Sequence, residues 1–244
     1  MIRTVEETGS TNADLVAALR AGETVHEGDW LIAKRQHAGR GRQGRKWEDG
    51  ADRITDQSSG NFMGSTVVHL DQLANQGPLL NLAVSIALHD AVSDFLTQRE
   101  DLLLKWPNDL LLRGAKMSGV LLERVEQSIV VGVGVNLAYS PDLPDRKTIS
   151  LADIGPVPAR QAFAERVAMR FSTELGRWRE FGEEPLRRRW LELGHPIGTL
   201  LSVHDVDGTR VSGHFEGLAS GGAMLLRLAD GESRAIHVGD VSID

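Results

Sequence analysis

The sequence predicts an α+β protein in which a large mixed domain is followed by a small all-β domain. Helix and strand patterns are interspersed over residues 1–194, whereas short strands separated by Gly and Asp turns fill residues 195–244. With 244 residues, 41% of them hydrophobic, the chain can bury one large core and a small second one. We therefore expect a boundary at His195-Pro196, which separates the two patterns.

The first elements read as strand, helix and strand. Strands are expected over Ile2–Glu6 and Asp29–Lys34, with a helix over Asn12–Ala21 between them. Ser10 or Thr11 is a suitable N-cap for that helix. The strand over Asp29–Lys34 leads directly into a strongly basic run.

The middle of the large domain is dominated by one apolar helix. It is expected over Leu79–Thr97 and, being hydrophobic on most sides, should occupy the core. An irregular acidic segment is expected over residues 48–59. Strands are expected over Phe62–Leu70, Leu102–Trp106, Leu110–Leu112, Met117–Arg124 and Ile129–Leu137.

The strand over Ile129–Leu137 has an unusual alternation. One face carries Val131, Val133 and Val135, and the other carries Gly132, Gly134 and Asn136. Glycines inside a strand often mark a close approach by another group, although a glycine-relieved core strand is the plain alternative.

Two helices and four strands complete the expected elements. The helices are Ala159–Phe181 and Pro185–Leu193, and the strands of the small domain are Gly198–Val203, Arg210–Leu218, Ala223–Leu228 and Ser233–Val238.

The basic run covers residues 34–46, reads KRQHAGRGRQGRK and is closed by Trp47. It contains Lys34, Arg35, Arg40, Arg42, Arg45 and Lys46 around three glycines, without a carboxylate. Glycine allows a ligand to approach the main chain, and arginine donors match phosphate and carboxylate oxygens. The run therefore predicts an anion site. A solvated loop and an RNA-binding arginine-glycine segment are the alternatives.

Composition limits the function classes. The net charge is −7 despite the basic run, so positive charge is local and a general nucleic-acid binder is disfavoured. The chain contains no Cys, begins without an apolar or basic leader, and has no apolar run of membrane-spanning length. We expect a cytoplasmic protein without nucleic-acid or membrane partners and without room for an N-terminal DNA-binding module.

Two further polar motifs lie next to predicted strands, one at a strand end and one, Lys116, before a strand, where a solvated lysine is the plain alternative. Pro107 cannot occupy a central strand, so Asn108 and Asp109 should lie at a sheet end. They form an ordinary turn pair, or Asp109 carries Mg²⁺ for a bound nucleotide. Lys116 precedes the small residues Ser118 and Gly119, which would leave space for a ligand. No P-loop, Rossmann fingerprint or Ser/His/Asp arrangement is present.

In order along the chain, these motifs resemble the catalytic domain of biotin protein ligases. The ordered set is Ser10-Thr11-Asn12, Gly39–Trp47, Lys105–Asp109, Lys116 with Ser118–Glu123, and Gly132–Asn136. The resemblance implies a mixed sheet flanked by helices, related to class II aminoacyl-tRNA synthetases, with an SH3-like β-barrel at the C-terminus. It covers roughly residues 10–136. The segment after Trp47 is longer and more acidic than is usual in the family.

The resemblance also implies a two-step reaction that uses ATP, Mg²⁺ and biotin. Biotin is activated to biotinyl-5′-AMP and then transferred to a lysine of a biotin carboxyl carrier protein or domain of a carboxylase, such as acetyl-CoA carboxylase. A homodimer is left open, because the sequence does not decide the oligomeric state.

The family's site residues transfer by motif. The catalytic set is Arg42, Lys116 and Asp109, with Asp109 as the metal ligand or as a proton acceptor. The biotin-binding set is Ser10, Thr11, Asn12, Gln36, Gly39, Arg40, Arg42, Lys116 and Gly119. The set for ATP or the adenylate is Arg40, Arg42, Arg45, Trp47, Asn108, Lys116 and Asn136. The rival hypotheses are a lipoate or octanoate ligase or transferase, an RNA-binding module, and a non-catalytic adenylate-binding or scaffold protein.

Overall fold

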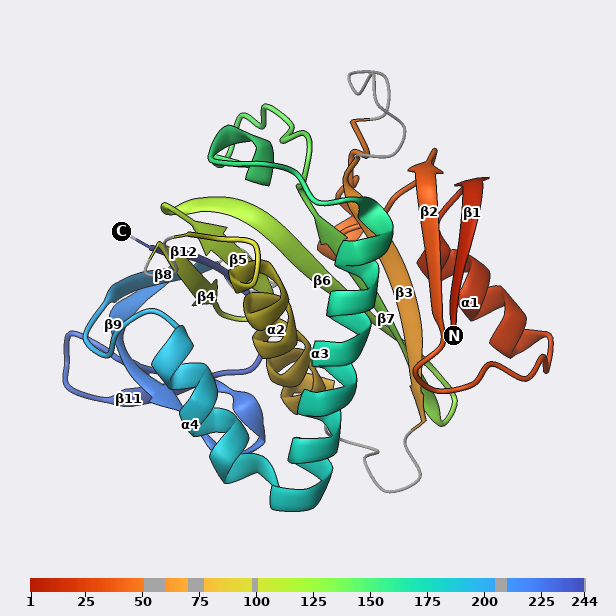
Figure 1. The fold of residues 1–244 in the computed structure, drawn as a ribbon. Coiled ribbons are helices and arrows are strands. Elements are labelled where there is room, and N and C mark those ends of the chain that lie inside the picture. Colours follow the sequence, from red (N-terminus) through yellow and green to blue (C-terminus); the bar gives the residue numbers. More distant parts are fainter. Residues whose placement is uncertain (51–59, 70–76, 98–100, 205–209, 244) are drawn as a thin grey trace.

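A seven-stranded mixed sheet forms the centre of the molecule (Figure 1). The structure is a computed structural model and describes residues 1–50, 60–69, 77–97, 101–204 and 210–243. The strand order is β1-β2-β3-β7-β6-β5-β4; β1 and β2 are parallel, and the other neighbours are antiparallel. The strands are β1 (Ile2–Thr8), β2 (Trp30–Gln36), β3 (Phe62–His69), β4 (Leu102–Lys105), β5 (Asp109–Leu112), β6 (Ala115–Val125) and β7 (Ser128–Val135). The predicted mixed sheet is therefore confirmed.

Helices cover the two faces of this sheet unequally. Helix α1 (Thr11–Arg20) packs on one face against β2, β3, β6 and β7, and its N-cap is Ser10. Helices α2 (Gly77–Ser93) and α3 (Arg160–Phe181) pack together on the other face, and α4 (Glu183–Leu193) follows them (Figure 1). The expected end of α2 at Thr97 was wrong, because the bonds from Phe95 to Val92 and from Leu96 to Ser93 tighten the chain into a turn.

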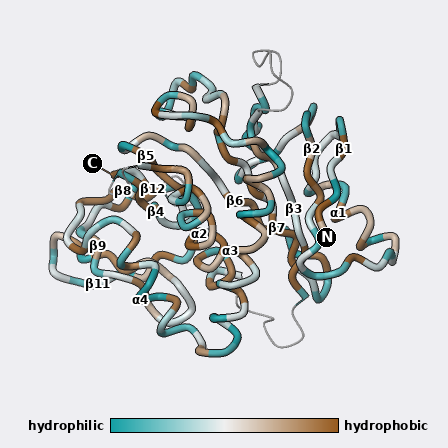
Figure 2. The backbone as a smooth tube through the Cα atoms, in the orientation of Figure 1, coloured by the Kyte–Doolittle hydropathy of each residue, from teal (hydrophilic) through white to brown (hydrophobic). Residues whose placement is uncertain are grey.

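The alternation in β7 separates these faces as predicted. Val131, Val133 and Val135 belong to the large core beneath the helices. Gly132 and Gly134 lie on the opposite face, where α1 covers only part of the sheet. Figure 2 shows the hydrophobic stretches along the central strands and the hydrophilic ones on the outer loops.

A second, five-stranded antiparallel sheet follows α4. Its order is β11-β10-β9-β8-β12. The strands are β8 (Leu200–His204), β9 (Arg210–Leu218), β10 (Met224–Arg227), β11 (Ser233–Ile236) and β12 (Asp240–Ile243). Strand β12 was not expected from the sequence, because four residues with alternating polarity give too short a signal. Closure of the sheet into a barrel stays a prediction.

The two sheets share one apolar core. Leu104 of β4, Trp190 of α4 and Phe215 of β9 belong to the same buried cluster. The indole Nε1 of Trp106 also donates a hydrogen bond to the carbonyl oxygen of Gly222, at 3.1 Å. Residues before and after position 194 therefore pack against each other.

Most of the acidic segment 48–59 lies outside the described residues, since these omit 51–59. Among the helices that the structure describes, none combines the length and apolar character needed to cross a bilayer.

Candidate active site

A cavity of about 380 Å³ opens on the α1 face of the large sheet. Its floor is formed by β3, β6 and β7, and the basic run covers one side. Almost every residue of the predicted site lines it: Ser10, Thr11, Asn12, Gln36, Arg40, Arg42, Arg45, Trp47, Asn108, Asp109, Lys116, Gly119 and Asn136. Gly39 is not in the lining, and instead accepts a backbone hydrogen bond from Trp47 at 2.9 Å. Segments distant in the sequence are thus brought to one place.

Glycines make the floor of this cavity. A Cβ atom on Gly134 would lie 2.3 Å from the Trp47 ring, and one on Gly132 would lie 2.3 Å from the side-chain oxygen of Asn12. Neither distance is compatible with a side chain. The two glycines therefore let Trp47 and Asn12 lie directly on the sheet.

One end of the cavity is rich in hydroxyl and amide groups. The side-chain oxygen of Gln36 accepts hydrogen bonds from the Thr11 backbone N–H at 2.7 Å and from the Thr11 hydroxyl at 3.1 Å. The hydroxyls of Thr11 and Ser65 are 2.7 Å apart. Ser10 holds the start of α1 through the Ala13 N–H. This end can recognise a small polar group by hydrogen bonds.

The basic loop (residues 39–47) folds back on itself at the cavity wall. Two backbone hydrogen bonds join its ends: the Gly41 N–H donates to the Arg45 carbonyl oxygen at 2.7 Å, and the Trp47 N–H donates to the Gly39 carbonyl oxygen at 2.9 Å. A Cβ on Gly39 would lie 2.6 Å from the Trp47 carbonyl oxygen, so this position needs glycine. The interleaved glycines thus serve a compact loop that directs arginines at the cavity.

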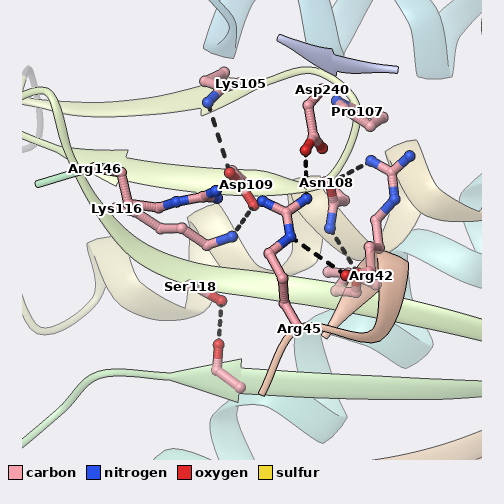
Figure 3. A network of polar contacts seen from close by, with 12 residues as sticks. Arg42, Arg45, Lys105, Pro107, Asn108, Asp109, Lys116, Ser118, Arg146 and Asp240 are labelled. Carbon is pink, nitrogen blue, oxygen red and sulfur yellow. Dashed lines mark hydrogen bonds and ion pairs between the residues drawn. The ribbon is translucent and has the colours of Figure 1, made fainter. Parts of the chain in front are cut away.

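The other end of the cavity is cationic (Figure 3). Arg42 Nη1 donates to Asn108 Oδ1 at 2.9 Å. Asp109 pairs with Lys116 at 2.5 Å and with Lys105 at 3.7 Å. Two lysines therefore share one carboxylate, which leaves net positive charge for an anion.

Burial changes the protonation equilibria at this end. Burial lowers the pKa of Lys105 below its ordinary value, and the charge of Asp109 opposes this effect. Burial also lowers the pKa of the Arg42 guanidinium, against the opposing charges of Asp240 and Asp109. Arginine titrates so far above neutral pH that Arg42 remains a fixed cation.

Two polar atoms in the cavity wall lack partners among the described residues. They are the side-chain oxygen of Asn136 and the indole nitrogen of Trp47, both buried. The amide nitrogen of Asn136 is held by the Ile149 carbonyl oxygen at 3.3 Å. Since buried polar groups are nearly always satisfied, these atoms are available to a ligand.

The structure adds lining residues that the sequence did not identify. Ser65 is a polar residue in a largely apolar strand, and this pattern could have identified it as a candidate site residue. Arg146 lies in the loop over residues 140–149, where no residue could be assigned, and it pairs with Asp145. Asp240 belongs to the second sheet and forms an ion pair with Arg45 at 2.5 Å. No local sequence pattern predicts this contact.

The described residues offer little for a protein-only metal centre. They contain no group of three or more His, Cys, Asp or Glu side chains arranged to hold a metal ion. Asp109 lies at the cationic end and pairs with Lys116 and Lys105, whereas Asp145 and Asp240 of the same lining pair with Arg146 and Arg45. Use of Asp109 as a ligand would match the way in which Mg²⁺ is bound with nucleotides, through one or two carboxylates, phosphate oxygens and waters.

Comparison with known proteins gives a consistent family. Residues 6–138 match the model of the biotin/lipoate A/B protein ligase family. A biotin–[acetyl-CoA-carboxylase] ligase of Paracoccus denitrificans is 32% identical over 235 residues, covering 90% of this chain and 91% of that protein. The ligase of the same name from Mycobacterium tuberculosis is 33% identical and covers 97% of this chain and 86% of its own length.

Solved structures support the fold. The biotin protein ligase of Aquifex aeolicus in complex with biotin and ATP aligns with a TM-score of 0.81 at 23% identity, covering 100% of this chain and 98% of that one. A biotin protein ligase of Leishmania major in complex with biotinyl-5-AMP aligns with a TM-score of 0.64 at 20% identity, covering 97% and 98%.

Proposed function

This chain belongs to the biotin/lipoate A/B protein ligase family, and we propose that it activates biotin with ATP and transfers it to a lysine of a carrier protein. One observation carries the proposal. A single cavity joins a hydroxyl and amide end to a cationic end across a glycine floor. Biotin has the matching order of groups, with a polar ureido ring, an apolar chain and a carboxylate.

Biotin is proposed to lie along this floor. The ureido ring contacts Ser10, Thr11 and Gln36, where hydroxyl and amide groups gather. The apolar chain crosses the sheet beside Trp47. The carboxylate meets the cationic end. Asn12, Gly39, Arg40, Arg42, Lys116 and Gly119 complete the proposed biotin set.

The first step forms biotinyl-5′-AMP. A carboxylate oxygen of biotin attacks the α-phosphorus of ATP, and the bond to the pyrophosphate oxygen breaks with its electron pair leaving on pyrophosphate. Negative charge accumulates on the phosphate oxygens in the transition state. Arg42 and Lys116 are placed in the cavity wall to stabilise this charge.

The adenylate is proposed to remain under the basic loop. Arg40, Arg42, Arg45, Trp47, Asn108, Lys116 and Asn136 form the proposed set. Arg42 is positioned by Asn108, and the unpartnered oxygen of Asn136 can accept a hydrogen bond from the adenylate. Retention matters because the mixed anhydride hydrolyses in water.

The second step transfers the biotinyl group. The neutral amine of the acceptor lysine attacks the carbonyl carbon, the bond to the phosphate oxygen breaks, and AMP leaves. The amine then loses a proton, for which Asp109 is the proposed acceptor. Asp109 is alternatively the ligand of Mg²⁺, which when bound offsets the charge of the ATP phosphates.

The partner, location and domain limits belong to the same proposal. The acceptor is proposed to be the biotin carboxyl carrier domain of acetyl-CoA carboxylase or a related carboxylase, because the relatives are named for this substrate. A cytoplasmic location follows if the carboxylase resides there. Residues 1–194 are proposed as the catalytic domain and residues 195–244 as the C-terminal domain.

The decisive experiment is ATP–pyrophosphate exchange with biotin, lipoate, octanoate or no acid. Exchange with biotin alone would support the proposal. Exchange with lipoate or octanoate would agree with the fold but would contradict biotin as the substrate. The absence of exchange with any acid, from folded protein with Mg²⁺ present, would favour a binding role.

A further inference from the structure

The hydrogen bonds at the polar end of the cavity continue beyond its wall to Glu123 of β6. Asn12 Nδ2 donates to Glu123 Oε2 at 2.6 Å. The Ser65 hydroxyl donates to Asn12 Oδ1 at 2.8 Å, and the Thr11 hydroxyl lies 2.7 Å from the Ser65 hydroxyl. Glu123 does not line the cavity, and the reaction described above gives it no role.

The carboxylate of Glu123 dictates the direction of every hydrogen bond in this network. A carboxylate only accepts, so the Asn12 amide must present its nitrogen to Glu123 and its oxygen to Ser65. The opposite amide orientation would bring two oxygens within 2.6 Å. The single proton of Ser65 is then used on Asn12, and Thr11 must donate in the contact between the two hydroxyls. The one proton of Thr11 is therefore shared between Ser65 at 2.7 Å and the Gln36 oxygen at 3.1 Å.

The consequence is a cavity end that offers acceptors. With their protons used on protein acceptors, the Thr11 and Ser65 hydroxyls retain lone pairs for a ligand, and the Gln36 oxygen is held by the Thr11 backbone N–H. Such an end requires a ligand with N–H donors, since unmet buried acceptors oppose binding. The ureido ring of biotin has two N–H groups, whereas the dithiolane of lipoate and the tail of octanoate have none.

The sheet holds this arrangement rigidly. Glu123 pairs with Val130, and Leu121 pairs with Gly132, which places Glu123 and Gly132 on the same face of β6 and β7. A Cβ on Gly132 would lie 2.3 Å from the Asn12 oxygen, so the amide rests on bare backbone. Ser65 is also the neighbour of Gly132 in β3.

We propose that Glu123 is a positioning residue that sets the hydrogen-bond direction of the polar end and thereby selects an N–H-bearing acid. The inference rests on the proposed function for the identity of that acid. It assigns specificity to a side chain that the ligand does not touch.

The experiment exchanges the amide and the carboxylate between positions 12 and 123. Glu123→Gln replaces a group that only accepts with an amide that can also donate, so the orientation of Asn12 is no longer fixed. It is expected to raise the KM for biotin in pyrophosphate exchange by roughly tenfold, with kcat within about twofold. Asn12→Asp opposes two carboxylates and should raise KM further. In the combined variant Asn12→Asp/Glu123→Gln, the new amide donates to the new carboxylate, whose second oxygen accepts from Ser65. This variant should recover most of the loss.

Glu165→Gln is the matched control, because it makes the same change at an exposed position on α3. Thermal unfolding of the four proteins without ligand measures the coupling of Asn12 and Glu123 independently of activity. Additive effects on KM and on unfolding would overturn the inference. If the wild type performs no exchange with biotin, the proposed function fails, and the unfolding cycle still decides whether the two residues are coupled.

Discussion

At the residue scale, Lys116 is one of the two cations proposed to stabilise the transition state. Its ammonium pairs with Asp109 and has space because a Cβ on Gly119 would lie only 3.3 Å from Nζ. Lys116→Ala should slow pyrophosphate exchange by roughly a hundredfold, the scale of losing one preorganised charge donor. Pyrophosphate-exchange kinetics measure the rate, and a thermal melting curve shows whether the variant is folded. Lys147→Ala, an exposed neighbour, should leave the rate unchanged. Undiminished exchange in Lys116→Ala would remove Lys116 from the site.

Arg42 is expected to act on retention of the intermediate. It is held by Asn108 at 2.9 Å and remains charged in the cavity wall. Arg42→Gly should still form biotinyl-AMP but release it roughly tenfold faster or more, because a charge-assisted phosphate contact is lost. Release of labelled adenylate after rapid dilution measures the rate. Retention equal to that of the wild type would contradict the role.

At the element scale, the contact of β7 with the basic loop determines the cavity's shape. Gly134→Ala would put a Cβ 2.3 Å from the Trp47 ring, and the loop must then move. We expect the KM for biotin to rise by roughly tenfold, because each loop arginine shifts with it. Steady-state kinetics would reveal this.

Gly176→Ala is the control for that variant. Gly176 lies within α3, and nothing occupies the space of its missing Cβ. Its replacement should leave KM unchanged and stabilise the protein by roughly 0.5–1 kcal/mol, as alanine favours a helix interior. If both alanine variants had the same KM, the shape of the loop would not depend on Gly134.

At the scale of the whole molecule, one ion pair ties the second sheet to the loop over the cavity. Arg45 and Asp240 meet at 2.5 Å, each with more than a third of its side chain exposed. Asp240→Asn should therefore change stability by less than about 1 kcal/mol. It should still release the adenylate severalfold faster, because the loop loses its outer anchor. Asp230→Asn, on an exposed turn of the same sheet, is the control. Equal release rates would show that the pair has no part in retention.

The junction of the two sheets also predicts a pH dependence of stability. Burial, with a smaller contribution from the charge of Lys105, lowers the pKa of His195 from 6.5 to about 4. His195 packs against Trp190 and Phe215. Between these pH values the unfolded chain binds a proton that the folded chain does not, so stability falls as the pH drops from about 6.5 to about 4. The loss is roughly 3 kcal/mol at the lower limit.

Urea unfolding at pH 4.5 and 7.5 tests this dependence. His195→Phe should remove most of the difference between the two pH values, whereas His204→Phe, at an exposed position, should retain it. A difference unchanged in His195→Phe would mean that other groups cause it.

The sequence by itself determined the local elements and indicated the candidate residues of the site. Alternation of valine and glycine in residues 131–135 predicted the two faces of β7, and the spacing of glycine and arginine in residues 39–46 predicted an anion-binding loop. Both are periodic or local patterns, which depend on neighbours in the chain. The individual site residues were assigned by the resemblance of such motifs to a known family, and nearly all of them line one cavity.

The tertiary structure decided which distant side chains meet. Ser65, Glu123, Arg146 and Asp240 reach the site or its support through strand register and through contact between the two sheets. A single serine or glutamate in a strand has the same local signal whether or not it faces Asn12. The pairing of strands, which depends on the free energy of the whole sheet and core, makes that difference.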